Sequence, residues 1–128
     1  MEYMFEEPTP EKPAHPLMGE FDNFRMLLYS NIAACYLKLK KYSDVIDNCN
    51  PIIDHPTSTD AVKAKSYYRR GQAYENTNNL EEALADYTKG SELLNGTDKA
   101  LNNAIKLVNY KIQQQAKKEK AMYAKLFS

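Results

Sequence analysis

The sequence contains no tryptophan, only two cysteines and four glycines, and no excess of charge of either sign. Because 17 basic side chains balance 17 acidic ones, the net charge gives no support to general nucleic-acid binding. The uncharged apolar runs, such as 26–29 and 32–37, are far shorter than the roughly 20 residues that a membrane span needs. We therefore expect a single globular domain within the 128 residues.

The shortage of cysteine also bears on the compartment. Cys35 and Cys49 are too few for a disulfide framework, so we interpret both as reduced, buried thiols. The chain opens without the basic and apolar segments that make up a secretory signal. Together these features predict a cytoplasmic protein.

Glycine is scarce, with four in the whole chain, and only two of the six prolines lie beyond position 16, which favours helices over a sheet with many turns. Four of the six prolines fall at positions 8, 10, 13 and 16, in a segment that also carries Glu2, Glu6, Glu7 and Glu11. We expect residues 1–19 to be an acidic, proline-rich arm that is extended or disordered. Residues 20–127 are then the ordered domain.

An internal repeat appears when the chain is compared with itself at an offset of 38 residues. Apolar or small residues recur in the same order, and the first five pairs also match roughly in size: Tyr29 with Tyr67, Ala33 with Gly71, Tyr36 with Tyr74, Tyr42 with Leu80, Val45 with Ala83, Cys49 with Tyr87, and Ile52 with Gly90. Small residues at these spacings allow two helices of one repeat to approach closely, and large ones fill the gaps beside them.

The repeat predicts five helices, at about 20–40, 43–54, 60–77, 80–95 and 97–126. Thr59 or Asp60 is a suitable N-cap for the third helix, and Asn95-Gly96 is a suitable left-handed stop for the fourth. The predicted fold is therefore all-α: an α-solenoid of about two antiparallel helix pairs, at about 20–54 and 60–95, closed by a long C-terminal capping helix. Beyond Gln113 this last helix turns polar and basic, so we expect it to project past the domain.

The helix pairs resemble the tetratricopeptide repeat, with about four residues added to its period of about 34 in the loop 54–60. Three stretches narrow the resemblance: 29–42, 65–73 and the basic ending 118–127. Together they are similar to the C-terminal repeat domain of large immunophilins of the FK506-binding type and of related co-chaperones. That family has three repeats and an extended helix. By this comparison the two visible pairs are the second and third repeats, and the first helix of a first repeat has no counterpart in this sequence.

The resemblance implies a function: docking of the acidic Glu-Glu-Val-Asp tail of the 90-kDa or 70-kDa heat-shock chaperones. The family holds the tail's carboxylates with five side chains, and three of them map onto Asn31, Lys65 and Arg69. The other two would lie on the missing first helix, so we expect binding to be weakened in this chain. Gln72 and Asn76 continue the same helix face and are expected to line the groove.

The residues themselves permit this function, although a solvated helix face is the alternative. Lys65 and Arg69 are four positions apart and share one face of a helix. A guanidinium can hold a carboxylate through two parallel hydrogen bonds, and an ammonium adds a point charge. Asn31 occupies the same repeat position as Arg69, which lies 38 residues later, so stacking would bring both to one wall.

We find no signature of an enzyme, a cofactor site or a metal site. His15 and His55 lie beside prolines in expected loops, without ligand spacing or a nucleophile nearby. An isomerase activity would belong to another part of a longer, immunophilin-like protein. The second hypothesis for the function is an assembly segment that binds partners by helix packing, without carboxylate recognition. Because no helix precedes the first pair, we also expect Phe24, Leu27 and Leu28 to be partly uncovered. We expect either self-association through that face, or the arm folding back over it with Met4, Phe5, Leu17 and Met18.

Overall fold

The computed structural model describes residues 18–128, and five α-helices account for most of them. They are α1 (Met18–Lys38), α2 (Tyr42–Asp54), α3 (Asp60–Asn76), α4 (Leu80–Leu93) and α5 (Lys99–Leu126). The all-α prediction is confirmed, and the expected boundaries differ from these by about two residues. Apart from its last two residues, which begin α1, the expected arm 1–19 lies outside the described residues. No helix within residues 18–128 combines the length and apolar character needed to cross a bilayer.

The helix ends follow the capping residues in the sequence. Thr59 caps α3, because its side chain accepts a hydrogen bond from the backbone N–H of Val62 at 3.3 Å. Asp98 caps α5 in the same way, accepting from the N–H of Leu101 at 2.9 Å. After α4, Asn95 and Gly96 both adopt the left-handed conformation, with φ of 56° and 70°. This conformation reverses the chain and directs it into α5.

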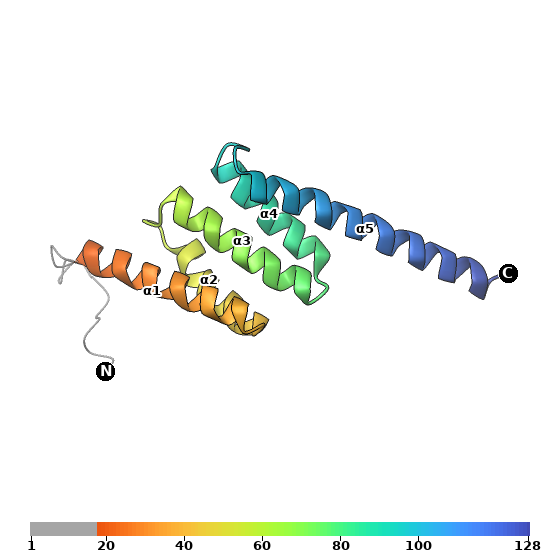
Figure 1. Cartoon of the computed structure of the whole chain (residues 1–128), viewed down its shortest axis with the longest axis horizontal. Coiled ribbons are helices and arrows are strands. Elements are labelled where there is room, and N and C mark those ends of the chain that lie inside the picture. Colours follow the sequence, from red (N-terminus) through yellow and green to blue (C-terminus); the bar gives the residue numbers. More distant parts are fainter. Residues whose placement is uncertain (1–17) are drawn as a thin grey trace, which may run out of the picture.

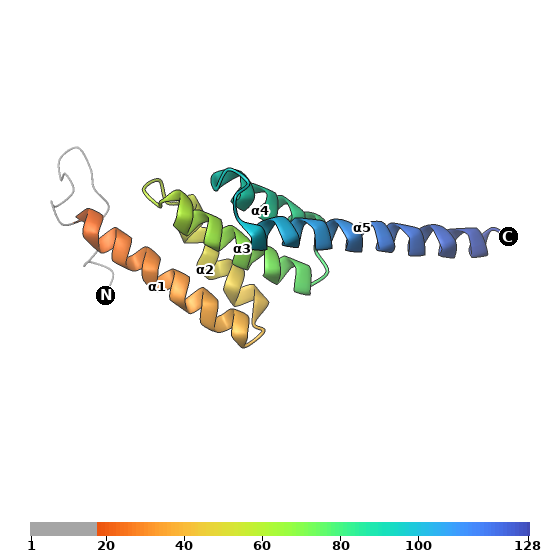
Figure 2. The same cartoon turned by 45° about the horizontal axis from the view of Figure 1, so that its top comes forward.

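The helices stack as an α-solenoid. Each helix packs against the next in the chain, and α1 also contacts α3 across the two repeats. In Figure 1, α1, α3 and α5 follow one another across the molecule, and the C-terminal half of α5 extends beyond the other helices. Figure 2 shows the same projecting segment from a second direction, as the polar sequence beyond Gln113 predicts.

Small residues mark the places where helices approach closely, as the repeat predicts. Ala33 and Ala73 are fully buried together with Val45 and Cys49 in the cluster between the first and second pairs. A second cluster joins the second pair to α5 and contains Leu80, Ala83, Tyr87, Leu101 and Val108. Gly71 lies directly against the ring of Tyr87, where an added Cβ would be 2.6 Å from the nearest ring carbon.

The two thiols differ, which corrects the expectation that both are buried. Cys49 is buried, and this burial raises the pKa of its thiol to about 11. Cys35 is exposed, because it lies on the side of α1 that no described helix covers. Small apolar residues occur on both sides of α1, so their size alone does not identify the buried side.

A polar network fixes the angle between the two repeats. Arg70 on α3 donates to both carboxylate oxygens of Asp86 on α4, each at 2.8 Å, and to the side-chain oxygen of Asn50 on α2, also at 2.8 Å. The hydrogen bonds to Asp86 raise the pKa of Arg70, which therefore stays charged. One guanidinium thus joins three helices.

A second polar network links α5 to α3 and α4. The hydroxyl of Tyr87 donates to one carboxylate oxygen of Glu75 at 2.8 Å, and Lys111 on α5 donates to the other. Burial, together with this hydrogen bond, raises the pKa of Tyr87, so the phenol stays protonated. The contact between Lys111 and Glu75 thus joins α5 to α3.

Candidate functional site

Arg69 connects α3 to α1. Its Nη1 donates to the backbone oxygen of Ser30 at 2.8 Å and to the Ser30 hydroxyl at 2.7 Å. Ser30 is itself 8% exposed, so the contact lies at the helix–helix boundary. The guanidinium is thereby held against Ser30, the residue that precedes Asn31 in α1.

The other expected site residues on α3 share a stripe with Arg69. Positions 65, 69, 72 and 76 are three or four residues apart, so their side chains occupy one face of the helix. Lys65 is exposed one turn before Arg69, and Gln72 is half-buried one turn after it. Asn76, in the last turn, donates its amide to the backbone oxygen of Gln72 at 2.7 Å.

Asn31 is exposed on α1, at the repeat position that corresponds to Arg69. The structure records no hydrogen bond between Asn31 and the cations on α3. Its relationship to them is indirect: Arg69 is bonded to its neighbour, Ser30. The proximity of Asn31 and Arg69 therefore depends on the packing of α1 against α3.

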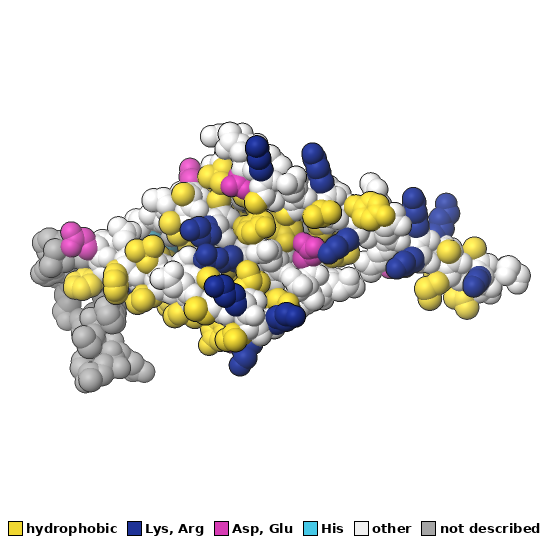
Figure 3. Space-filling model, in the orientation of Figure 1, with side chains coloured by type: hydrophobic (Ala, Val, Ile, Leu, Met, Phe, Trp, Pro, Cys, Tyr) yellow, Lys and Arg dark blue, Asp and Glu magenta, His cyan; other side chains and the backbone are white. Residues whose placement is uncertain are grey.

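The surface over α1 and α3 is basic. Figure 3 shows Lys and Arg side chains in a row that crosses α3 and the C-terminal half of α1, without acidic side chains among them on that face. The chain as a whole is neutral, so this row reflects the distribution of the charges and not their balance. A face of one sign attracts ligands of the opposite sign.

Two apolar hollows lie on either side of the Lys65 position, one repeat apart. The α1–α3 pocket, of about 200 Å³, is lined by Asn23, Met26, Leu27, Ser58, Thr59 and Val62. The α3–α5 pocket, of about 240 Å³, is lined by Ala61, Ala64, Lys65, Tyr68, Leu94, Asp98, Ala100 and Leu101. Adding 38 to positions 23, 26, 27 and 62 gives 61, 64, 65 and 100, so the pockets are repeat equivalents. The sequence analysis predicted neither pocket, although the 38-residue offset relates the residues that line them.

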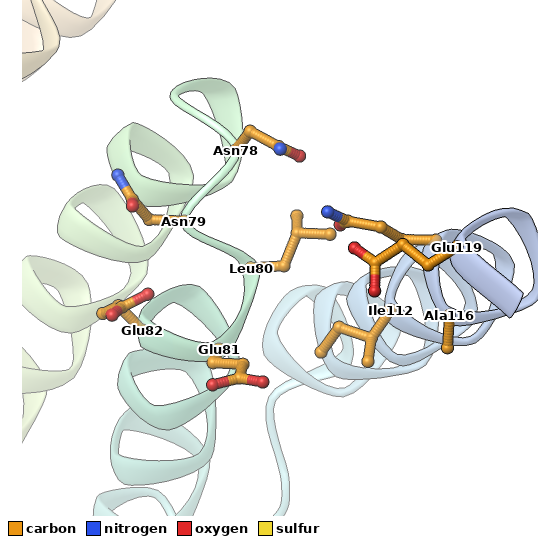
Figure 4. Close-up of a pocket in the computed structure, with 9 residues that line it drawn as sticks. Asn78, Asn79, Leu80, Glu81, Glu82, Ile112, Ala116 and Glu119 are labelled. Atoms are coloured by element: carbon orange, nitrogen blue, oxygen red, sulfur yellow. The ribbon is translucent and has the colours of Figure 1, made fainter. Parts of the chain in front are cut away.

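A further hollow lies where the turn between α3 and α4 meets α5. It measures about 310 Å³, and Leu80 projects from the start of α4 toward α5, whose residues Ile112 and Ala116 line the opposite side (Figure 4). Glu81 and Glu82 from the first turn of α4 and Glu119 from α5 give it acidic walls. Within residues 18–128 no cluster of His, Cys, Asp or Glu side chains has a metal-binding arrangement. The acidic walls make this hollow unsuitable for a carboxylate ligand.

Comparison with known proteins agrees with the geometry. Residues 64–96, which cover most of α3 and all of α4, match the tetratricopeptide repeat. The second helix pair is therefore a tetratricopeptide repeat. The match covers the second of the two helix pairs, and the 38-residue offset relates the first pair to it.

Relatives of this repeat module are large immunophilins. Peptidyl-prolyl cis-trans isomerase FKBP4 of Bos taurus is 33% identical over 103 residues, which is 80% of this chain and 21% of the relative. FK506-binding protein 59 of Drosophila melanogaster is 32% identical over 109 residues, 85% of this chain and 24% of the relative. Peptidyl-prolyl cis-trans isomerase CYP7 of Saccharomyces cerevisiae is 32% identical over 109 residues, 85% of this chain and 28% of the relative.

The expected resemblance is thus confirmed as homology over the repeat-like region. The chain spans only 21–28% of the length of these relatives. The isomerase activity in two of their names therefore refers to those longer proteins. The described residues form helical repeats and a capping helix. What the module shares with these relatives is therefore a surface for protein interaction.

Proposed function

We propose that this module is a cytoplasmic, co-chaperone-like adaptor, formed by residues 20–127, that binds acidic C-terminal peptides. The partners we propose are the Glu-Glu-Val-Asp tails of the 90-kDa or 70-kDa heat-shock chaperones, held by Asn31, Lys65 and Arg69. One observation supports the proposal: Ser30, which precedes Asn31 in α1, holds the Arg69 guanidinium at the boundary between α1 and α3. A cation restrained in this way loses less side-chain freedom when it binds a ligand.

Arg69 retains the atoms that carboxylate binding requires. Both of its recorded hydrogen bonds use Nη1, so the edge formed by Nε and Nη2 is the part of the guanidinium that would receive a carboxylate. Lys65, exposed one turn away, adds a second positive charge. Two like charges at this spacing repel each other modestly, and an anion placed between them removes that repulsion. Gln72 and Asn76 would then line the groove beside the peptide backbone.

The affinity should be low. Two of the five family contacts have no counterpart in this sequence, and a hydrogen bond to a charged group contributes about 1.5–3 kcal/mol. Their loss would cost about 3–6 kcal/mol, which is about 10²- to 10⁴-fold in affinity. Calorimetry with a peptide ending in Glu-Glu-Val-Asp should therefore detect weak binding or none, and low-micromolar binding would contradict this expectation.

Variants separate the proposed contacts from general electrostatic attraction. In a titration followed by nuclear magnetic resonance, which detects weak complexes, Lys65→Ala should weaken peptide binding by about tenfold or more. Lys89→Ala is the matched control, since Lys89 is an exposed lysine on α4 and the change in net charge is the same. An equal loss of affinity in both variants would count against specific contacts.

The second candidate function, assembly by helix packing, is favoured by the uncovered face of α1. Phe24, Leu27 and Leu28 are 63%, 54% and 47% exposed, as expected, and Phe21 and Ile32 extend the same apolar surface. Contiguous apolar surface of this kind usually marks a protein interface. Light scattering should show self-association that Phe24→Ser together with Leu28→Ser abolishes, and a monomer at all concentrations would exclude this candidate.

A further inference from the structure

The α1–α3 pocket is apolar but lies next to positive charge. None of its six lining residues is charged, and Met26, Leu27 and Val62 give it an apolar surface. Lys65 follows Val62 by three positions on α3, so the two side chains are neighbours separated by about 5–6 Å. Arg69 lies one turn further along the same helix. The pocket and the two cations thus follow one another along α3 and are here called the strip, with Lys65 also lining the neighbouring α3–α5 pocket.

A ligand that fits this strip needs an apolar side chain followed closely by carboxylates. The sequence of this chain contains such a segment outside the described residues: Met1-Glu-Tyr-Met-Phe-Glu-Glu7. It combines Tyr3, Met4 and Phe5 with Glu6 and Glu7, and it contains no lysine or arginine. Its charge and its apolar content are both complementary to the strip.

We propose that residues 1–7 bind this strip in their own chain, with Phe5 in the α1–α3 pocket and Glu6 and Glu7 facing Lys65 and Arg69. The segment then competes with acidic peptides for the cations. The proposal therefore adds a regulatory element to the proposed function and rests on it for the competition, although docking of the segment does not depend on peptide binding.

The length of the intervening chain permits this arrangement. Ten residues, 8–17, separate Glu7 from Met18, where α1 begins, and the eleven Cα–Cα steps of this connection span about 36 Å when extended. The pocket begins at Asn23, only about 8 Å along α1 from Met18. The connection therefore has ample length to turn back. A tethered segment of this kind acts at a millimolar effective concentration, high enough to compete with weak ligands.

The spacing of the segment matches the spacing of the strip. Successive residues of an extended chain are about 3.3 Å apart, so Glu6 and Glu7 lie about 3–7 Å beyond Phe5. Lys65 lies about one helical turn, 5.4 Å, beyond the pocket residue Val62. With Phe5 in the pocket, the two carboxylates fall within reach of Lys65 and its neighbour Arg69.

Methyl resonances of Leu27 and Val62 in the whole chain report on the pocket without any added peptide. Met4→Ser combined with Phe5→Ser should shift both resonances, whereas the methyls of the buried Val108 should not move. The control, Ala14→Ser with His15→Ser, changes the same arm outside the proposed segment and should leave all of them in place. Unshifted Leu27 and Val62 resonances in the first variant would overturn the proposal, as would shifts that disappear on dilution.

Peptide affinity then tests the competition. Removing a competitor that occupies the site for most of the time should raise the apparent affinity for a Glu-Glu-Val-Asp peptide by about three- to tenfold. Methyl shifts with unchanged peptide affinity would contradict competition for the cations. If no variant binds the peptide at all, the proposed function fails, and the methyl resonances still decide whether the segment docks.

Discussion

The Arg69 guanidinium donates two hydrogen bonds to Ser30, one to its backbone oxygen and one to its hydroxyl. This contact joins helices whose interacting residues are 39 positions apart in the sequence. It gives Arg69 two roles, because the same side chain stabilises the packing of α1 on α3 and offers its other edge to a carboxylate.

These two roles can be separated by comparing Arg69 with Lys65. Arg69→Ala should lower the free energy of unfolding by about 1–3 kcal/mol, since it leaves the oxygens of the buried Ser30 without their charged donor. Lys65→Ala should change stability by less than about 0.5 kcal/mol, because Lys65 is exposed. Urea denaturation measures both. A strongly destabilised Lys65→Ala variant would show that Lys65 is a structural residue and not a free binding group.

Arg70, the next residue, should be the most sensitive charged residue in the fold. Arg70→Ala leaves Asp86 buried without its partner and removes the donor to Asn50, so we expect a loss of about 3–5 kcal/mol. Arg25→Ala is the control: it breaks an exposed pair with Asp22 within one helix and should cost less than about 1 kcal/mol. Thermal or urea unfolding that ranked the two variants equally would contradict the role assigned to Arg70.

Because α3 approaches α4 closely at Gly71, a larger residue at this position should destabilise the protein. Gly71→Ala places a methyl group 2.6 Å from the Tyr87 ring, so overpacking should outweigh the gain in helix propensity and destabilise the protein by about 1–3 kcal/mol. Gly19→Ala has open space around the new methyl group and should be neutral or slightly stabilising. A stabilised Gly71→Ala variant would mean that the helices separate easily at this point.

The stability should fall at alkaline pH. The pKa of Cys49 rises from 9.0 to about 11 in the folded protein, and the pKa of Tyr87 is raised as well. Each group holds its proton more tightly when folded, so its contribution is complete below the pKa of the unfolded state and declines as the pH rises above it. We expect the free energy of unfolding to decrease between about pH 9 and 11, and Cys49→Ala should show a shallower decrease. Identical slopes would contradict this assignment.

The sequence predicts the helices of this fold better than the contacts between them. Helical periodicity and the caps at Thr59 and Asp98 are local, so they can be recognised without knowing which helices are neighbours. The contact of Arg69 with Ser30 and the network of Arg70 depend on the angle at which the repeats stack. The prediction of a buried Cys35 is wrong for the same reason, since local sequence does not show which side of α1 is covered.

In the candidate site, too, the local features could be predicted and the contacts between helices could not. Lys65 and Arg69 could be grouped from their spacing on one helix, and Asn31 from the repeat offset. The two pockets beside them arise where α1, α3 and α5 meet, so they depend on side chains from separate helices. Their repeat relationship becomes visible only when the lining residues are known.

The central claim is that Asn31, Lys65 and Arg69 recognise the terminal carboxylates of an acidic peptide. The most direct measurement is a map of amide chemical shifts in the whole chain during titration with a Glu-Glu-Val-Asp peptide, repeated with the same peptide amidated at its C-terminus. The account predicts that the largest shifts fall at 31, 65 and 69 and that amidation greatly reduces them. Shifts centred on other residues, or shifts of equal size with the amidated peptide, would contradict it.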